Sequence, residues 1–113
     1  MTAQARLAAL AAGIEADPAA LAAVRREGDA LAEALGGDHA LRWRIAVVRA
    51  VMAAPPDGDA VRELYGELVD RYRDLPAGLA ALRPLGDEIR RREAAGSLAR
   101  SLVARSDRRR DRR

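Results

Sequence analysis

The chain of 113 residues contains no cysteine and no phenylalanine, and it has only one tryptophan and two tyrosines. The absence of cysteine excludes disulfide bonds and thiolate zinc sites, and it is compatible with a reducing compartment. No apolar run approaches the roughly 18 residues of a membrane span, and the first residues lack the basic start and apolar run of a secretion signal. We therefore expect a cytoplasmic protein with no membrane partner.

Lysine and asparagine are also absent, whereas arginine is abundant. The missing residue types have AT-rich codons, so the 20 arginines reflect GC-rich coding and do not by themselves indicate nucleic-acid binding. Their position is more informative than their number. Residues 1–89 have a formal charge of −4, residues 90–113 have +7, and the whole excess of +3 lies in residues 106–113, SDRRRDRR. The basic end either folds back on the acidic body or reaches an acidic partner.

Helix start and stop signals divide the chain, and no strand pattern occurs. Thr2 caps a first helix that runs to about residue 12. Asp17 followed by Pro18 begins a second helix, because the carboxylate accepts from free backbone N–H groups and proline needs no donor at the first helical position. The Gly36–Gly37 pair ends this helix.

A third helix is predicted from Asp38 to residue 54, where Pro55 and Pro56 must end it. Its apolar residues cover an arc of about 200°, wider than the ~100° stripe of a surface helix. We expect it to be the central helix of a bundle. Arg44 falls inside this arc, and it either pairs with a carboxylate or extends its charged head to the rim. Gly28, on the apolar face of the second helix, permits a close backbone approach or a break.

A fourth helix is predicted from about residue 58 to Leu75. The stretch PAGLAALRPLGDE then predicts a short helix over 77–83 and a restart at Pro84, which leads into a basic helix with Gly96–Ser97 as its end or a kink. Apolar spacing continues to about residue 105. The last eight residues are short, charged and terminal, which predicts disorder.

These elements predict an all-α fold, a compact bundle of four main helices plus one or two short helices, with a disordered basic C-terminal tail. Residues 1–105 form a single helical-bundle domain, and residues 106–113 form the Arg-rich tail. Short loops favour antiparallel neighbours. A pair of helical-hairpin repeats and a death-like six-helix bundle have compatible helix counts, so the topology stays open.

The only histidine, His39, opens the segment HALRWRI, which resembles the H-box of sensor histidine kinases. Four residues match that motif: His39, Leu41, Arg42 and Ile45. Ala40 stands where the family has an acid that assists phosphate transfer, and Gly36–Gly37 interrupts the helix before the histidine. The resemblance implies a stand-alone phosphotransfer bundle with His39 as phosphoacceptor. We favour the alternative, a solvated or locally capping histidine at the start of a helix.

An acidic line on the fourth helix is a second candidate site. Its members are spaced by 4, 3 and 4 residues: Glu63, Glu67, Asp70 and Asp74. ELVD at 67–70 resembles the second half of the carboxylate motif of all-α nucleotide pyrophosphohydrolases, which implies a hard cation such as magnesium. The Glu-x-x-Glu pair that this family carries on a preceding helix is missing. We favour a solvated stripe, or a docking face for Arg90–Arg92.

We predict a non-enzymatic helical module for protein–protein interaction, which acts as an adaptor, a regulatory subunit or a self-associating bundle. Serines occur only at 97, 101 and 106, far in sequence from His39, and we expect no cofactor and no metal. The partner is another protein or a second copy of the chain. The candidate interaction residues are Arg90, Arg91, Arg92, Leu98, Leu102, Arg108, Arg109 and Arg110.

The alternative function is nucleic-acid association through the Arg-rich C-terminus. Arginines on a tail neutralise phosphates without reading bases, which gives salt-dependent, non-specific binding. The three aromatic residues that would stack on single strands, Trp43, Tyr65 and Tyr72, all lie at core-like helical positions. We therefore rank nucleic acid below a protein partner.

Overall fold

The computed structural model describes the backbone of residues 1–53 and 58–111, and the side chains of residues 1–53 and 58–96. Within these ranges the chain is helical and contains no strand, so the predicted all-α class is confirmed. The elements in chain order are α1 (Ala3–Ala16), the 3-10 helix η1 (Pro18–Ala20), α2 (Leu21–Leu35), α3 (Gly37–Ala53), α4 (Gly58–Arg71) and α5 (Pro76–Asp111). No helix in the described ranges is long and apolar enough to cross a membrane.

The predicted caps form at the first two helix starts. The hydroxyl of Thr2 accepts a hydrogen bond from the backbone N–H of Ala5 at 3.1 Å. The carboxylate of Asp17 accepts one from the N–H of Ala19 at 3.2 Å. At the junction of α2 and α3, Gly36 and Gly37 have φ values of 63° and 57°, which lie in the left-handed region that favours glycine. This pair therefore sets the direction in which α3 leaves α2.

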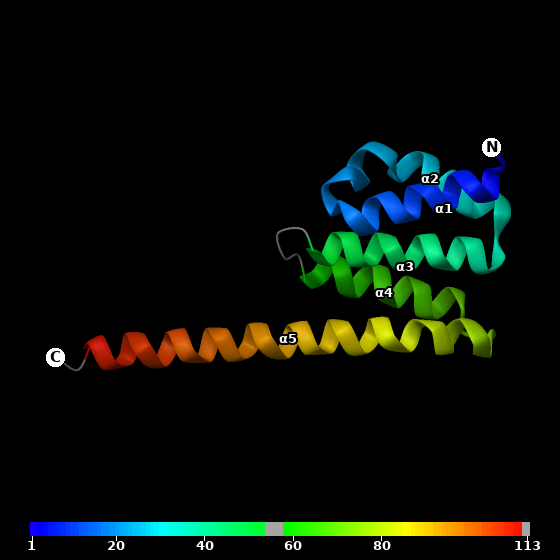
Figure 1. The fold of residues 1–113 in the computed structure, drawn as a ribbon. Coiled ribbons are helices and arrows are strands. Elements are labelled where there is room, and N and C mark those ends of the chain that lie inside the picture. The colour runs from blue at the N-terminus through cyan, green and yellow to red at the C-terminus, as the bar shows by residue number, and fades with distance from the viewer. Residues whose placement is uncertain (54–57, 112–113) are drawn as a thin grey trace.

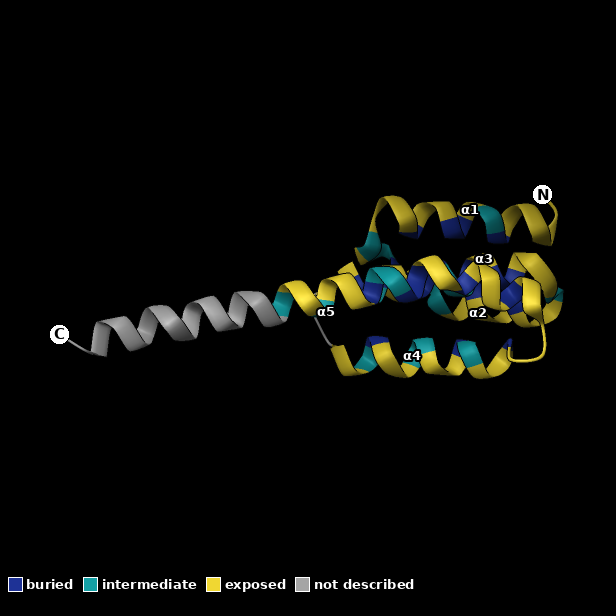
Figure 2. Ribbon diagram, turned by 90° about the horizontal axis from the view of Figure 1, so that it is seen from below, coloured by how far each residue is buried: buried dark blue, intermediate teal, exposed yellow. Residues whose placement is uncertain are grey.

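Helix α3 lies in the middle of the bundle, with α1 and α2 on one side and α4 and α5 on the other (Figure 1). Trp43, Ala46 and Val47 pack into the first core cluster, against α1 and α2. Leu41, Val48 and Met52 pack into the second cluster, against α4 and α5. Buried residues therefore occur on both sides of α3. In Figure 2 the buried positions of α1 and α4 face the helices that lie between them. This arrangement confirms the central helix predicted from the wide apolar arc.

The Trp43 indole is the largest fully buried side chain, and it packs directly on the α2 backbone at Gly28. A Cβ atom at Gly28 would lie only 1.9 Å from Trp43 Cζ2. The indole Nε1–H donates a hydrogen bond to Asp29 Oδ1 at 2.9 Å, so its single polar group is satisfied. Gly28 therefore allows the Trp43 ring to approach the α2 backbone closely, which is one of the two alternatives predicted for it. Helix α2 continues through Gly28 without a break.

The second half of the chain differs from the prediction. Instead of a short helix over 77–83 and a restart at Pro84, a single helix α5 runs from Pro76 to Asp111 with Pro84 inside it. Proline removes one backbone hydrogen bond, at a cost of about 3 kcal/mol in a helix interior. Pro84 lies on the exposed side, whereas Leu82, Leu85 and Ile89 are buried against the bundle. Their packing holds both halves of α5 in one helical register.

Beyond the bundle, α5 continues as a helix (Figure 1). Its last polar contacts to the other helices among the described side chains are made by Arg92 and Glu93. The Arg-rich tail predicted over 106–113 lies where α5 is described as backbone only, to Asp111. The disorder predicted for that tail falls outside the described side chains and stays a prediction.

We expect Gly28→Ala to lower the free energy of unfolding by about 1 to 3 kcal/mol or more, because the added methyl group overlaps the Trp43 ring. Gly66→Ala is the matched control. Gly66 also lies inside a helix, but nothing lies within 4 Å of the position that a Cβ atom would take there. Alanine should therefore stabilise that helix by about 0.5 to 1 kcal/mol. Urea titration followed by tryptophan fluorescence measures both changes, and equal effects of the two substitutions would contradict the packing.

Candidate interaction site

His39 lies exposed in the first turn of α3. It forms no hydrogen bond or ion pair with another described residue. This is the arrangement expected for a solvated histidine at a helix start. The three serines of the chain lie at residue 97 or later, so their side chains fall outside the described part.

The acidic line of α4 is exposed, and its last member lies beyond the helix. Glu63, Glu67 and Asp70 lie on α4, which ends at Arg71, and Asp74 lies in the turn that follows. Leu75 precedes a proline, which disfavours helical backbone at that residue. No group of three or more His, Cys, Asp or Glu residues in the described ranges could hold a metal ion.

The predicted docking of Arg90–Arg92 on this acidic line is not formed. Arg90 pairs with Asp87 on its own helix. Arg92 Nη1 donates to the backbone carbonyl of Met52 at 3.2 Å, near the end of α3, where a cation also interacts favourably with the helix dipole. Arg91 is exposed and has no hydrogen bond or ion pair to a described residue.

Many arginines of the bundle join one helix to another. Six ion pairs of this kind are Arg6–Glu27 (2.8 Å), Arg42–Glu15 (3.8 Å), Arg44–Glu33 (3.3 Å), Arg71–Glu33 (3.6 Å), Arg49–Glu88 (3.2 Å) and Arg62–Glu93 (2.6 Å). Exposed pairs of this type are each worth ~0 to 1 kcal/mol, so their main effect is on charge and orientation. They neutralise much of the positive charge of the bundle within the molecule.

A groove of about 420 Å³ lies between α2 and α4, with α3 as its floor. Val47 and Val48 belong to this floor, and Leu64 and Leu68 line the α4 wall. Six charged side chains also line the groove: Arg25, Asp29, Glu33, Arg44, Glu67 and Arg71. The groove therefore combines an apolar floor with charged walls, and it lies on the side of α4 that faces α2.

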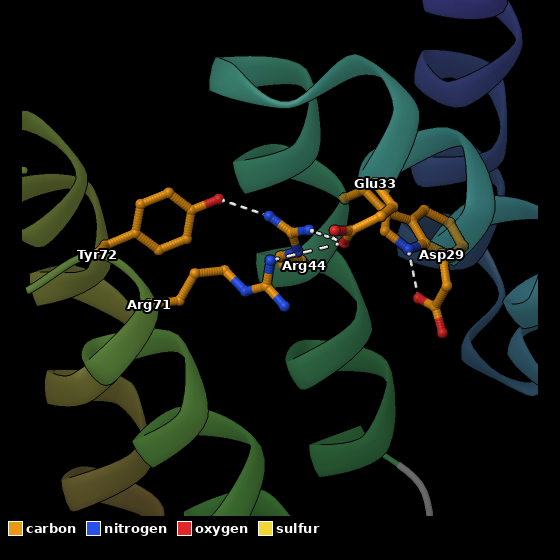
Figure 3. A network of polar contacts seen from close by, with 6 residues as sticks. Asp29, Glu33, Arg44, Arg71 and Tyr72 are labelled. Atoms are coloured by element: carbon orange, nitrogen blue, oxygen red, sulfur yellow. Dashed lines mark hydrogen bonds and ion pairs between the residues drawn. The ribbon is translucent and has the colours of Figure 1, made fainter.

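Arg44 links the two walls of this groove (Figure 3). Its side chain is only 17% exposed, and its guanidinium pairs with Glu33 of α2 at 3.3 Å. Its Nη1 also donates to the Tyr72 hydroxyl at 2.9 Å. The same Glu33 carboxylate forms an ion pair with Arg71 of α4, with 3.6 Å between Oε2 and Nη1. Of the two alternatives for Arg44, pairing with a carboxylate is therefore the one observed.

The structure brings together residues that the sequence did not connect. Arg44, Glu33 and Tyr72 come from three separate segments, and the only signal in the sequence was a charge inside the apolar arc of α3. The predicted interaction residues Leu98, Leu102, Arg108, Arg109 and Arg110 lie on α5 where no side chain is described.

Comparison of the chain with protein-family models, with curated proteins and with solved structures found no match.

We expect Tyr72→Phe to lower the free energy of unfolding by about 0.5 to 1.5 kcal/mol, because it removes the hydrogen bond from the largely buried Arg44. Tyr65→Phe is the control, since the Tyr65 hydroxyl has no hydrogen bond to a described residue. Chemical denaturation of both variants measures the difference. A loss for Tyr65→Phe as large as that for Tyr72→Phe would show that the Arg44 contact contributes nothing.

The Arg6 guanidinium donates two hydrogen bonds of 2.8 Å to the Glu27 carboxylate, and this contact holds the pKa of Glu27 below its usual value of 4.5. Because the folded-state pKa is lowered, the stabilisation by this pair is present above the unfolded-state pKa and is lost as the pH falls through the folded-state pKa. We expect NMR titration of the Glu27 carboxyl carbon to give a midpoint below 4.5.

Arg6→Gln should raise that midpoint toward the usual value, whereas Arg49→Gln, which removes an arginine pair between α3 and α5, should leave it unchanged. An unchanged Glu27 midpoint in Arg6→Gln would refute the ion pair between Arg6 of α1 and Glu27 of α2.

Proposed function

We propose that this protein is a non-enzymatic helical module for protein–protein interaction, and that the end of α5 is its contact element. The observation that carries the proposal is that α5 continues past the bundle while residues 90–113 carry a formal charge of +7. A charged helix that extends from a folded body offers its surface to a partner. Residues 1–89, in contrast, carry a formal charge of −4.

The bundle itself supports the same division of roles. Six of its arginines form ion pairs between helices, and its tryptophan is fully buried. Large hydrophobic side chains that are exposed in the described ranges are limited to Met1, Leu75 and Leu79. The bundle therefore acts as a scaffold, and the proposal assigns recognition to α5. The proposal places the protein in the cytoplasm, in agreement with the absence of cysteine.

A second candidate function is nucleic-acid association, which the same concentration of arginine on an extended helix favours. Each arginine that neutralises a phosphate releases counterions, so affinity would fall steeply with salt. The buried positions of Trp43 and Tyr72 speak against stacking on single-stranded bases. A protein partner remains the better supported function.

A pull-down from native cell lysate tests the proposal, with the full-length chain and a chain ending at Arg105 as baits, each with and without nuclease. We expect the full-length chain to retain a protein that survives nuclease treatment, and the shortened chain to retain much less of it because it lacks five arginines. Retained material that disappears with nuclease would instead establish nucleic-acid association. Retention of nothing by either bait would contradict both functions.

A further inference from the structure

We propose that the partner is a second copy of this chain, and that the Arg-rich end of α5 of each copy docks in the groove between α2 and α4 of the other. This inference rests on the proposed function, because it names the partner of the same α5 element. The product is a reciprocal homodimer with two equivalent contacts, the closed arrangement typical of homo-oligomers.

The groove offers unpaired carboxylates to a basic helix. Inside it, Arg25, Arg44 and Arg71 are each within ion-pair distance of Asp29 or Glu33. Glu67 lines the same groove, and Glu63 lies one helical turn before it on α4. Neither Glu63 nor Glu67 has an ion pair or a hydrogen bond to a described residue. The lining as a whole holds three arginines and three carboxylates, so the carboxylates left open to a partner are Glu67 in the groove and Glu63 beside it.

The end of α5 carries positive charge, which complements the carboxylates of Glu63 and Glu67. Residues 106–113 contain five arginines and two aspartates. Leu98 and Leu102 precede them at positions i and i+4, a spacing that helices use when they bind in grooves with apolar floors. The groove supplies such a floor in Val47 and Val48 and such a wall in Leu64 and Leu68.

The groove accommodates a short piece of helix. Its α4 wall runs from Leu64 to Arg71, which spans about 12 Å at 1.5 Å per residue. About two turns of the α5 end can therefore lie along this wall, beside Glu67.

The occupant must come from another molecule. Among the described residues, helix α5 packs on α3 and α4 and makes no contact with α2. It is one continuous helix that leaves the bundle, rather than a strap that turns back over it (Figure 1). The groove lies on the opposite side of α4, toward α2. A straight helix cannot reach the groove of its own copy, but the same segment of a second copy can enter it.

A charge-swap experiment with the full chain tests the proposal. The groove variant is Glu63→Arg with Glu67→Arg. The tail variant is Arg108→Glu, Arg109→Glu and Arg110→Glu. Sedimentation velocity from roughly 1 µM to roughly 1 mM gives the dimer dissociation constant of each variant, of the unmodified chain and of an equal mixture of both variants. Glu15→Arg on α1 is the matched control for charge reversal away from the groove. It removes only the ion pair between Glu15 and Arg42, whose atoms lie 3.8 Å apart.

We expect the unmodified chain to dimerise, with a dissociation constant that increases with salt. Each variant alone should raise the dissociation constant roughly tenfold or more, because it places like charges face to face. The equal mixture should recover the dimer, since each reversed groove then meets a tail of opposite charge. Glu15→Arg should leave dimerisation unchanged. The tail variant alters no residue of the bundle, so it remains informative if the groove variant fails to fold.

A chain that stays monomeric at every concentration would overturn this inference, and so would a mixture that recovers nothing. The proposed function would survive that failure if the lysate experiment retained a different, nuclease-resistant protein through the tail. Dimerisation that persists in the groove variant and is lost only in the tail variant would move the contact to another surface and overturn the assignment to the groove.

Discussion

The structure depends on a helix that is buried along two sides. Helix α3 must cover α1 and α2 with one side and α4 and α5 with the other, so its apolar arc leaves little room for charge. The tightest point is the Trp43 ring on the Gly28 backbone, where no larger residue fits without a shift. Burial of apolar surface on both sides of one helix lets a short chain build two core clusters that share α3.

The one charge within that arc also contributes to the groove between α2 and α4, which Arg44 lines. Arg44 needs a carboxylate, and it finds Glu33 on α2 and the hydroxyl of Tyr72 beyond α4. This network holds α2 and α4 in relation to each other across α3 instead of through direct packing of the two helices. The groove between them is therefore a consequence of the helix order, and its charged walls follow from the way in which Arg44 is satisfied.

The presence of the helices, the caps at Thr2 and Asp17 and the central place of α3 could be predicted from apolar periodicity and from helix start and stop residues, because these signals are local. The positions at which helices end were harder to predict. Pro84 marks a helix boundary by local rules, yet the packing of Leu82, Leu85 and Ile89 carries α5 through it. The first helix likewise continues past residue 12 to Ala16, because Ile14 is buried in the core. Contacts such as Arg44 with Tyr72 depend on how distant segments meet, which no local pattern encodes.

The contact between the basic end of α5 and the groove of another copy can be measured directly by paramagnetic broadening. Because the chain has no cysteine, Ala104→Cys provides a single attachment point for a nitroxide spin label. Labelled chain mixed with unlabelled, ¹⁵N-enriched chain reports contacts between molecules only. We expect amide signals around Glu33 and Glu67 to broaden, and high salt to reverse the broadening. No broadening between molecules, or broadening confined to α1, would contradict the contact.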